Sequence, residues 1–370
     1  MTEPLIPHKA SYDGRPIVIV TDAWRPQVNG VVRTLETLGE ELRAAGFAVE
    51  YITPLDYKTV PTPTYPEIRL SMNHWWSLGR RLKALQPFAI HIATEGPLGM
   101  AARAFCKRRN IGFTTSFHTK FPEYVTARTG LPVSWGYAVI RWFHGPSKGV
   151  LVATKSLREE LNGWGLHNLT PWTRGVRTEL FRPERASEVT LDLPRPIFTY
   201  VGRVAVEKNL PAFLDLDLPG SKLIVGDGPD IKSLRSKYPA AHFIGPRFGE
   251  DLAAHFAASD VFVFPSRTDT FGLVVVEALA SGLPVAAFPV PGPKDILGEA
   301  PQAGVLSEDL RAAALQALEL SKPDARAHAL TYSWEACRDM FLGNLAPIAR
   351  DHALAGLPKL ALAAAGAPKS

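Results

Sequence analysis

The sequence predicts an α/β protein made of two doubly wound domains that face each other across a cleft. Its 370 residues favour two domains, because single hydrophobic cores rarely grow to that size. Short apolar runs alternate with helical patterns along most of the chain, as in parallel sheets with helices on both faces. The alternation pauses once near the middle and then resumes, which indicates a domain boundary.

In the N-terminal half, apolar runs of strand length are followed by helical patterns. Strands are expected within 16–22, 49–54, 88–96, 112–119 and at the start of 149–161. Helices are expected over 30–46, through Ala104, and in the remainder of 149–161. This βαβ rhythm predicts a parallel sheet for the first domain.

The segment 181–196, FRPERASEVTLDLPRP, is charged, contains prolines and has no apolar period, so it is predicted to be a linker. The full predicted organisation is a Rossmann-like domain over 1–180, the linker, a second Rossmann-like domain over 197–345, and an alanine-rich tail over 346–370 that is a docked helix or frayed. Five strands are expected in the second domain, within 196–202, 221–228, 241–245, 260–266 and 284–290.

Composition excludes several functional classes. The net charge of +5 is too small to favour nucleic acid, but it suits an anionic ligand or an anionic membrane surface. Two cysteines far apart, Cys106 and Cys337, make no disulfide framework, so a reduced cytoplasmic location is expected. The N-terminus lacks the apolar core of a signal peptide, and no run of about 18 apolar residues exists, so membrane contact is expected to be peripheral.

The stretch 264–282, FPSRTDTFGLVVVEALASG, is the first candidate site. A predicted strand ends before Asp269, and a predicted helix ends at Gly282. Asp269 therefore lies in a loop at the cleft mouth, because ligands bind beyond the carboxyl ends of such strands. The first helical turn offers free amides to a phosphate or a sugar hydroxyl; these belong to Phe271, Gly272 and Leu273.

Glu277 lies one turn deeper in this helix, after three valines and before Ala-Leu-Ala. An unpaired buried carboxylate costs several kcal/mol, so this side chain is expected to have a partner. A ribose diol suits it, because two hydroxyls can donate to one carboxylate. The alternative is a glutamate at the exposed edge of an amphipathic helix.

Three further segments follow predicted strands. In YVGRVAVEKN (200–209), Arg203 and Lys208 are placed to hold a diphosphate and to neutralise it as it leaves, although solvated surface cations are the alternative. In 22–34, a proline-containing turn and Gly30 precede a helix and can present amides to a phosphate. His118 in SFHTKFP faces the predicted cleft, and its alternative is a hydrogen-bonded structural histidine.

Two motifs are set aside. Asp215-Leu216-Asp217 mimics a metal-binding pair of acids, but it lies in a predicted short helix or turn, so no metal is expected. GDGP (226–229) resembles a dinucleotide-binding turn, but the proline and the missing third glycine argue against NAD.

Taken together, these motifs resemble the GT-B glycosyltransferases, and within them the family-four group of retaining enzymes, which includes bacterial glycolipid synthases and GDP-mannose-dependent mannosyltransferases. The resemblance runs from about Pro16 to Leu342. The family signature is an acid, seven residues and a Glu; here Asp269 stands where Glu is usual, as in the glycolipid synthases, and Glu277 matches. GVRTELF departs from the family pattern at Arg177, where Asp is usual.

The resemblance implies a role for each matched residue. Arg203 and Lys208 would hold the diphosphate and Glu277 the ribose. Asp269 and the three amides at the helix start would hold the transferred sugar, and His118 would touch it near the reacting centre. Gly30 would approach the phosphates from the N-terminal domain, which takes the acceptor side, and the base would stack near 244–247. The family works without a metal or other cofactor; its donor is a nucleotide diphosphate sugar.

The expected reaction is transfer of a hexose with retention, a UDP-sugar being the favoured donor and a membrane lipid such as diacylglycerol the favoured acceptor. The segment 74–86 has an apolar stripe beside Arg80, Arg81 and Lys83, and Lys107–Arg109 adds cations, so binding at the anionic inner face of the plasma membrane is expected. An ordinary packed helix with a solvated basic face is the alternative.

Other activities stay open at this stage. One is a GDP-mannose-dependent mannosyltransferase with a soluble or polysaccharide acceptor. Others are a sugar-nucleotide epimerase, a phosphorylase and a non-catalytic binding protein of the same fold. The complete set of Arg203, Lys208, Asp269 and Glu277 argues against the last, because a protein without catalysis would be free to lose it.

Overall fold

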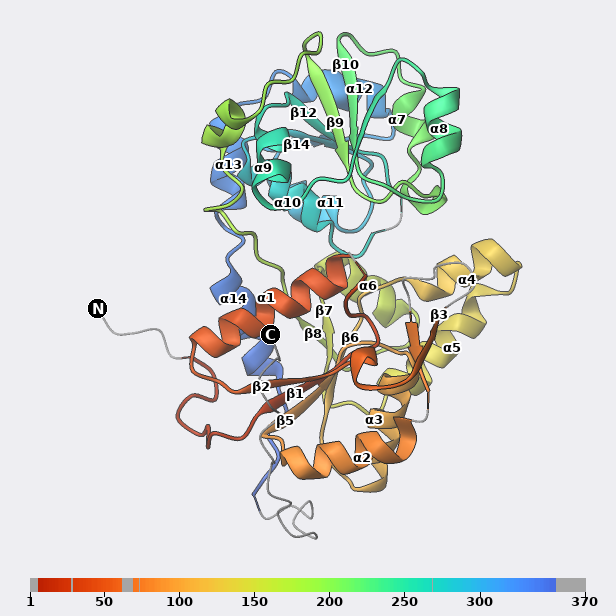
Figure 1. The fold of residues 1–370 in the computed structure, drawn as a ribbon, viewed down its shortest axis with the longest axis vertical. Helices are drawn as coiled ribbons and strands as arrows, with labels where there is room; N and C mark the ends of the chain where they lie inside the picture. The colour runs from red at the N-terminus through yellow and green to blue at the C-terminus, as the bar shows by residue number, and fades with distance from the viewer. Residues whose placement is uncertain (1–5, 28, 62–68, 73, 268, 351–370) are drawn as a thin grey trace, which may run out of the picture. The chain divides into compact units, whose positions relative to one another are not determined.

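The structure is a computed structural model that describes all residues except 1–5, 28, 62–68, 73, 268 and 351–370 (Figure 1). Most of the tail predicted over 346–370 therefore lies outside the described residues. The fold class is as predicted, because the described chain builds two six-stranded sheets with helices around them. None of the described helices has the length and apolarity needed to cross a bilayer.

The first sheet has the strand order β2-β1-β5-β6-β7-β8. Strand β1, second from one edge, pairs in parallel with β2 and with β5, and all four of its residues are fully buried. Burial on both faces is typical of parallel sheets. The strands are β1 (Ile17–Val20), β2 (Val49–Ile52), β5 (Ala89–Ile92), β6 (Thr114–Ser116), β7 (Val150–Val152) and β8 (Leu169–Pro171).

Two helices of the N-terminal half begin directly after a residue whose side chain caps them, Asn29 and Thr154. Helix α1 begins at Gly30 because the side chain of Asn29 accepts hydrogen bonds from the amides of Val31 and Val32. A two-stranded antiparallel sheet, β3 (Thr59–Pro61) with β4 (Arg69–Ser71), lies outside the main sheet. The helices are α1 (Gly30–Ala44), η1 (Pro54–Asp56), α2 (His74–Leu85), α3 (Pro97–Arg108), α4 (Phe121–Thr129), α5 (Val133–His144), α6 (Lys155–Gly163) and η2 (Pro183–Glu188).

The second sheet has the strand order β11-β10-β9-β12-β13-β14, and the pairs in it are parallel. Its strands are β9 (Ile197–Val201), β10 (Ser221–Val225), β11 (His242–Gly245), β12 (Val261–Phe264), β13 (Val285–Ala287) and β14 (Gly304–Leu306). The helices of this half are η3 (Val206–Lys208), α7 (Pro211–Leu214), α8 (Ile231–Lys237), α9 (Gly249–Ala257), α10 (Leu273–Ala280), α11 (Pro293–Leu297), α12 (Leu310–Ala317), α13 (Lys322–Ala329) and α14 (Trp334–Asn344).

All ten strands expected from the sequence are present, and the structure adds others. Strands β8 and β14 escaped prediction because neither lies in an apolar run of strand length. Helices α4 and α5 were also not predicted. The segment 181–196 contains η2, in which Arg185 pairs with Glu188 at 2.8 Å and with Glu250 of α9 at 2.9 Å.

The chain divides into two compact units. As far as these ranges are described, the first comprises Met1–Phe117, Trp142–Val150 and Leu342–Ser370, and the second comprises His118–Arg141 and Leu151–Phe341. In the first unit, Leu78 and Leu82 of α2 are fully buried with Phe105 and Cys106 of α3. In the second, the valines of α10 pack on β12 and β13.

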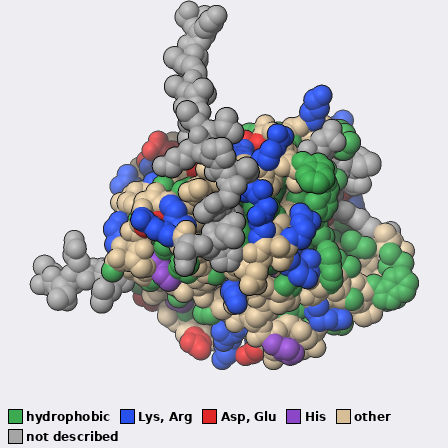
Figure 2. All heavy atoms as spheres, turned by 90° about the horizontal axis from the view of Figure 1, so that it is seen from below, with side chains coloured by type: hydrophobic (Ala, Val, Ile, Leu, Met, Phe, Trp, Pro, Cys, Tyr) green, Lys and Arg blue, Asp and Glu red, His purple; other side chains and the backbone are tan. Residues whose placement is uncertain are grey.

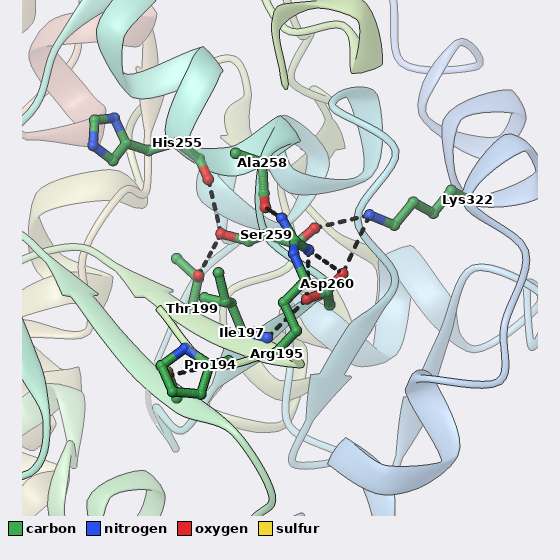
Figure 3. Close-up of polar contacts among 10 residues, drawn as sticks. Pro194, Arg195, Ile197, Thr199, His255, Ala258, Ser259, Asp260 and Lys322 are labelled. Carbon is green, nitrogen blue, oxygen red and sulfur yellow. Dashed lines mark hydrogen bonds and ion pairs between the residues drawn. The ribbon is translucent and has the colours of Figure 1, made fainter. Parts of the chain in front are cut away.

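An ion-pair network fastens the amino ends of β9 and β12 (Figure 3). The Nη1 of Arg195 donates to both carboxylate oxygens of Asp260, at 2.7 and 2.8 Å, and Asp260 also accepts from the amide of Ile197 at 2.8 Å. Lys322 lies 3.7 Å from the same carboxylate and donates to the carbonyl of Ser259 at 2.8 Å. The network therefore fixes where these two neighbouring strands begin.

Candidate functional site

The candidate site lies where the strand order of the second sheet reverses. The chain runs outward from β9 through β10 to β11, and outward on the other side from β12 through β13 to β14. Crossovers that leave two adjacent strands in opposite directions open a crevice at their carboxyl ends, and ligands bind there. The loop after β9 carries Arg203 and Lys208, and the loop after β12 carries Asp269.

Lys208 and Asp269 form an ion pair that joins these two loops. The Nζ of Lys208 lies 2.9 Å from Oδ2 of Asp269, and the side chains are 24% and 18% exposed. Burial alone would raise the pKa of Asp269, but the charge of Lys208 and hydrogen bonds from Lys208, Phe271 and Thr270 hold it below 3.8. Burial alone would lower the pKa of Lys208, and the carboxylate raises it. Both groups are therefore charged at neutral pH.

Two more hydrogen bonds join the same loops, and neither was expected from the sequence. The side-chain amide of Asn209 donates to the carbonyl of Pro265 at 3.1 Å, and the hydroxyl of Ser266 donates to the carbonyl of Glu207 at 3.4 Å. Asn209 has a φ of 53°, a left-handed conformation that asparagine tolerates better than most residues. In the sequence, the position of Asn209 in the EKN motif was the feature that could have pointed to this role. These bonds preset the distance between the two loops.

The amino end of α10 meets the predicted role only in part. Asp269 Oδ1 already accepts from the amides of Thr270 at 2.8 Å and Phe271 at 3.2 Å. Among the described residues, no hydrogen bond occupies the amides of Gly272 and Leu273. Gly272 has a φ of 87°, which a residue with a Cβ would adopt only under strain. The glycine therefore sets the angle at which the helix presents these amides.

Glu277 is buried, with 4% of its surface exposed. It lies in α10 among Val275, Val276, Ala278 and Leu279, each fully buried. The apolar setting inferred from the sequence is therefore correct, and the alternative of an exposed edge position is wrong. Burial explains why this carboxylate needs polar groups around it.

Arg203 lies two residues beyond β9, at the same end of the sheet. The phenolic hydroxyl of Tyr200 donates to its carbonyl at 2.7 Å, which shapes the turn. The GDGP turn packs its backbone directly on this loop: a Cβ at Gly226 would lie 1.9 Å from the carbonyl oxygen of Gly202. The glycines of GDGP thus serve close packing between two loops beside Arg203.

His118 lies two residues beyond β6, and a buried cation orients it. The Nη2 of Arg174 lies 3.3 Å from Nδ1 of His118, and burial lowers the pKa of Arg174 to about 10. A guanidinium can only donate, so Nδ1 accepts and the ring proton belongs on Nε2. Within the second unit, the hydroxyl of Thr270 donates to the backbone carbonyl of His118 at 2.8 Å, which brings His118 next to the loop of Asp269.

Gly30 belongs to the first unit, at the carboxyl end of its sheet. It is exposed at the start of α1, where the Asn29 side chain occupies the amides of Val31 and Val32.

Asp22, which follows β1, accepts from the amides of Leu98 at 2.9 Å and Gly99 at 3.2 Å. Burial raises the pKa of Asp22 to about 6.

The other polar clusters show different arrangements. Among the described residues, no group of three or more His, Cys, Asp or Glu side chains is placed to hold a metal ion. Asp215 accepts from the hydroxyl of Tyr238 at 2.7 Å, whereas the side chain of Asp217 is 98% exposed.

A cavity of about 320 Å³ lies at the opposite, amino end of the sheet, lined by Arg195, Asp260 and Lys322 among others (Figure 3). Its charged groups already pair with one another, so it is separate from the candidate site.

Comparison with known proteins agrees with the geometry. Residues 28–180 match the family described as Glycosyltransferase Family 4, and residues 195–322 match Glycosyl transferases group 1. A GDP-mannose-dependent alpha-mannosyltransferase of Mycobacterium tuberculosis is 31% identical over 76% of this chain and 81% of its own length. The sulfoquinovosyl transferase SQD2 of Arabidopsis thaliana is 31% identical over 73% of this chain and 54% of its own length.

Solved structures show the same fold. A sucrose-phosphate synthase from Thermosynechococcus elongatus superposes with a TM-score of 0.70 at 22% identity, over 88% of this chain and 96% of the other. Anabaena Alr3699/HepE in complex with UDP superposes with a TM-score of 0.66 at 14% identity, over 88% of this chain and 98% of the other. With this fold and the mannosyltransferase similarity together, the chain belongs to the family-four glycosyltransferases of the GT-B fold.

Proposed function

We propose that this glycosyltransferase moves a hexose from a nucleotide diphosphate sugar to a membrane lipid acceptor, with retention at the anomeric carbon. The observation that carries the proposal is the joined pair of loops at the reversal of the second sheet. There a cation, a carboxylate held at a helix start and two unoccupied amides lie at one strand edge. These groups match the charges and hydroxyls of a sugar diphosphate.

Each residue has a proposed role. Arg203 and Lys208 hold the diphosphate, and Glu277 accepts from the ribose hydroxyls. Asp269 and the amides of Gly272 and Leu273 hold the sugar, with the amide of Phe271 acting through Asp269. His118 donates from Nε2 to a sugar hydroxyl, because Arg174 occupies Nδ1. Gly30 approaches the phosphates from the first unit. We keep a metal out of this scheme, since the two cations supply the positive charge.

The proposed reaction forms one bond and breaks one bond at the same face of the sugar. The acceptor oxygen bonds to the anomeric carbon while the bond from that carbon to the diphosphate oxygen breaks. The acceptor proton passes to the departing phosphate oxygen, so no protein base is required. The chain contributes orientation and stabilises the negative charge that grows on the diphosphate.

Two donor classes are supported by relatives. A UDP-sugar with a lipid acceptor is our first candidate, supported by relatives named for glycolipid synthesis, among them the alpha-monoglucosyldiacylglycerol synthase of Streptococcus pneumoniae, 26% identical over 85% of this chain. A GDP-mannose donor with a soluble or polysaccharide acceptor is the second. It is supported by the mannosyltransferase of Corynebacterium glutamicum, 28% identical over 87% of this chain. A cytoplasmic location with peripheral membrane binding accompanies the first candidate.

One experiment separates these candidates. The purified protein is incubated with a panel of UDP-sugars and GDP-mannose, with diacylglycerol vesicles or with soluble glycosides, and nucleotide release is measured. The anomeric coupling constant of the product reports retention, and an EDTA arm reports metal dependence. If the wild type released nucleotide from every donor no faster than the Lys208→Ala variant does, the proposed function would be wrong. Free sugar formed without any acceptor would favour the epimerase alternative.

A further inference from the structure

The strand order of the first sheet reverses between β1 and β5. The chain runs outward from β1 to β2 on one side, and outward from β5 through β6 and β7 to β8 on the other. A ligand crevice is therefore expected at the carboxyl ends of these two adjacent strands. Two acids lie there: Asp22 is two residues beyond β1, and Glu95 is three residues beyond β5.

The carboxylate of Asp22 is committed to the fold. Its Oδ1 accepts from the amide of Leu98 at 2.9 Å. Its Oδ2 accepts from the amide of Gly99 at 3.2 Å and from the hydroxyl of Thr94 at 3.1 Å, so the side chain caps α3 from a neighbouring strand. Gly96 leaves room for this cap, because a Cβ there would lie 2.4 Å from Cγ of Asp22. Both oxygens of Asp22 are thus used within the protein.

Glu95 is held through one oxygen only. Its Oε1 lies 3.1 Å from Nε2 of the fully buried His144, and Nδ1 of that ring lies 2.8 Å from the hydroxyl of Thr115. An ionised carboxylate can only accept, so Nε2 carries a proton and donates it to Glu95. In the described part of the chain no hydrogen bond reaches Oε2, and the Glu95 side chain is 12% exposed. The second oxygen is therefore available at the carboxyl edge of the sheet.

The neighbours of Glu95 in TEGPLG (94–99) have structural reasons for their positions. Pro97 is the first residue of α3, where a missing N–H leaves no hydrogen bond unmade. A Cβ at Gly99 would lie 1.9 Å from the carbonyl oxygen of Thr94. Glu95 is the charged residue of this segment, and its carboxylate and a buried imidazole are costly to desolvate. Such a pair at the edge of a crevice indicates a role beyond packing.

The protein as a whole has a small excess of positive charge. The net charge is +5, and Figure 2 shows Lys and Arg side chains spread over one face of the molecule, with fewer Asp and Glu side chains among them. At long range this charge attracts anions, so discrimination against an anionic acceptor has to come from a carboxylate close to the accepting hydroxyl. The charge of Glu95 acts within this crevice, since it adds to burial in raising the pKa of Asp22 to about 6.

We propose that Glu95 determines which acceptors the enzyme takes. Its Oε2 accepts a hydrogen bond from a hydroxyl of the acceptor, and its negative charge excludes acceptors that carry a phosphate beside that hydroxyl. The acceptor class is therefore a neutral group with a hydroxyl, such as diacylglycerol or an uncharged glycoside. His144 is a positioning residue, because it orients Glu95 through Oε1. The proposal rests on the proposed function, with the first unit as the acceptor side, and it names the class of acceptor.

The test compares transfer to a neutral acceptor and to a related anionic one. The pairs are diacylglycerol with phosphatidylglycerol, both in phosphatidylcholine vesicles, and methyl mannoside with its 6-phosphate. Glu95→Gln keeps the shape of the side chain without its charge, and Glu95→Asp keeps the charge on a shorter side chain. Glu50→Gln is the matched control, because it removes the same charge from an exposed position of β2 in the same unit. Thermal unfolding and nucleotide binding verify that each variant is folded.

We expect the wild type to prefer the neutral acceptor of each pair that it uses. In Glu95→Gln the ratio of the neutral to the anionic kcat/KM should fall about tenfold or more, since like charges at short range repel strongly in a partly buried site. Glu95→Asp should keep the preference while raising the KM for the acceptor, and Glu50→Gln should change neither quantity. His144→Leu should raise the KM for the acceptor and leave that for the donor unchanged. His144→Gln, whose amide can still donate, should restore part of the loss.

Three outcomes would count against these roles. Equal transfer by the wild type to both acceptors of a pair would overturn this proposal and leave the proposed function intact. The same fall of the ratio in Glu50→Gln as in Glu95→Gln would also overturn it, because overall charge would then explain the preference. Transfer from no nucleotide sugar to any of these acceptors would defeat the proposed function, and this proposal would fall with it.

Discussion

The ammonium group of Lys208 lies 2.9 Å from the carboxylate of Asp269, and this ion pair joins the loops that follow two adjacent parallel strands. The carboxylate also receives two backbone amides at the start of α10. In the proposed function this cation faces the diphosphate, and the ion pair keeps it oriented before any ligand arrives. Preorganised charge of this kind contributes to rate more than to ground-state binding.

Lys208→Ala should therefore lower kcat/KM by about a hundredfold or more, because a positive group facing the growing charge is lost. Asp269→Asn should also lower it. The double variant should lose less than the sum of the two, since the side chains act as one unit. Steady-state kinetics with the donor identified by the panel provides the measurement. Lys232→Ala, an exposed lysine of α8, is the control. Strict additivity would show that the pair is not a functional unit.

Glu277→Gln should weaken nucleotide binding by roughly 1.5–3 kcal/mol, as for loss of a hydrogen bond to a charged group. The carboxylate is 4% exposed, and a neutral amide of the same shape keeps the packing of α10. Calorimetry with the nucleoside diphosphate measures the change, and Glu319→Gln, an exposed glutamate, is the control. A deoxyribose form of the nucleotide should show no further loss in the variant. If it does, Glu277 does not contact the ribose.

Arg174→Met should lower turnover, because the group that fixes the tautomer of His118 is lost. With Arg174 present, its guanidinium donates to Nδ1 of His118 across 3.3 Å, so the ring proton belongs on Nε2. Without this donor, either ring nitrogen can carry the proton, and the Nε2–H donor proposed for the sugar is no longer fixed. Steady-state kinetics with the donor identified by the panel measures the loss. Nitrogen NMR of the imidazole would reveal the tautomer directly, and a wild-type ring protonated on Nδ1 would contradict the assignment.

Asp22 should make the protein less stable as the pH rises from about 4 to 6. Burial raises the pKa of this carboxyl from its ordinary value of 3.8 to about 6 in the folded chain, so the folded state binds the extra proton. The stabilisation is complete below the pKa that Asp22 has in the unfolded chain, and it is lost as the pH rises through its pKa in the folded chain. A shift of about two units corresponds to roughly 3 kcal/mol.

Urea unfolding of wild type and Asp22→Asn, at pH values on both sides of this window, measures that dependence. The asparagine variant lacks the titrating group, so its stability relative to wild type should improve as the pH rises. Loss of one acceptor for the amides of Leu98 and Gly99 adds an offset that is the same at every pH. A constant difference between the two proteins across the window would show that Asp22 keeps an ordinary pKa when folded.

The fold was predictable from the sequence because short, fully apolar runs such as 17–20 and 261–264 alternate with helical patterns, as buried strands of a parallel sheet do. Strand β8 was not predictable, because its pattern, Leu-Thr-Pro, is partly exposed and carries no period. Which side of α5 is exposed was hidden for a different reason. Its apolar residues occur on all sides of the helix, so the sequence alone does not tell which of them are covered.

The sequence predicted which candidate residues lie at strand ends, whereas their role stays a prediction. Arg203, Lys208, Asp269 and Glu277 follow from the positions of β9, β12 and α10. The sequence could not reveal that Asp269 already occupies the amide of Phe271, because the direction of a side chain in a loop depends on distant contacts. Nor could it show that Arg174, 56 residues beyond His118, meets that ring. Such pairs arise from tertiary packing, which local patterns do not encode.

The Arg195–Asp260 ion pair has a consequence for mapping function by mutation. It lies at the amino ends of β9 and β12, whose register is set by only two partner pairs, Val261 with Phe198 and Phe262 with Thr199. A slip of one residue between these strands would turn every side chain to the opposite face and displace Lys208 from Asp269. Damage at Arg195 would therefore imitate damage to the candidate site in any activity screen, although the two lie at opposite ends of these strands. A screen that records thermal stability beside turnover would distinguish the two, because Asp260 also holds the amide of Ile197 and faces Lys322, so loss of this network loosens the strand ends themselves.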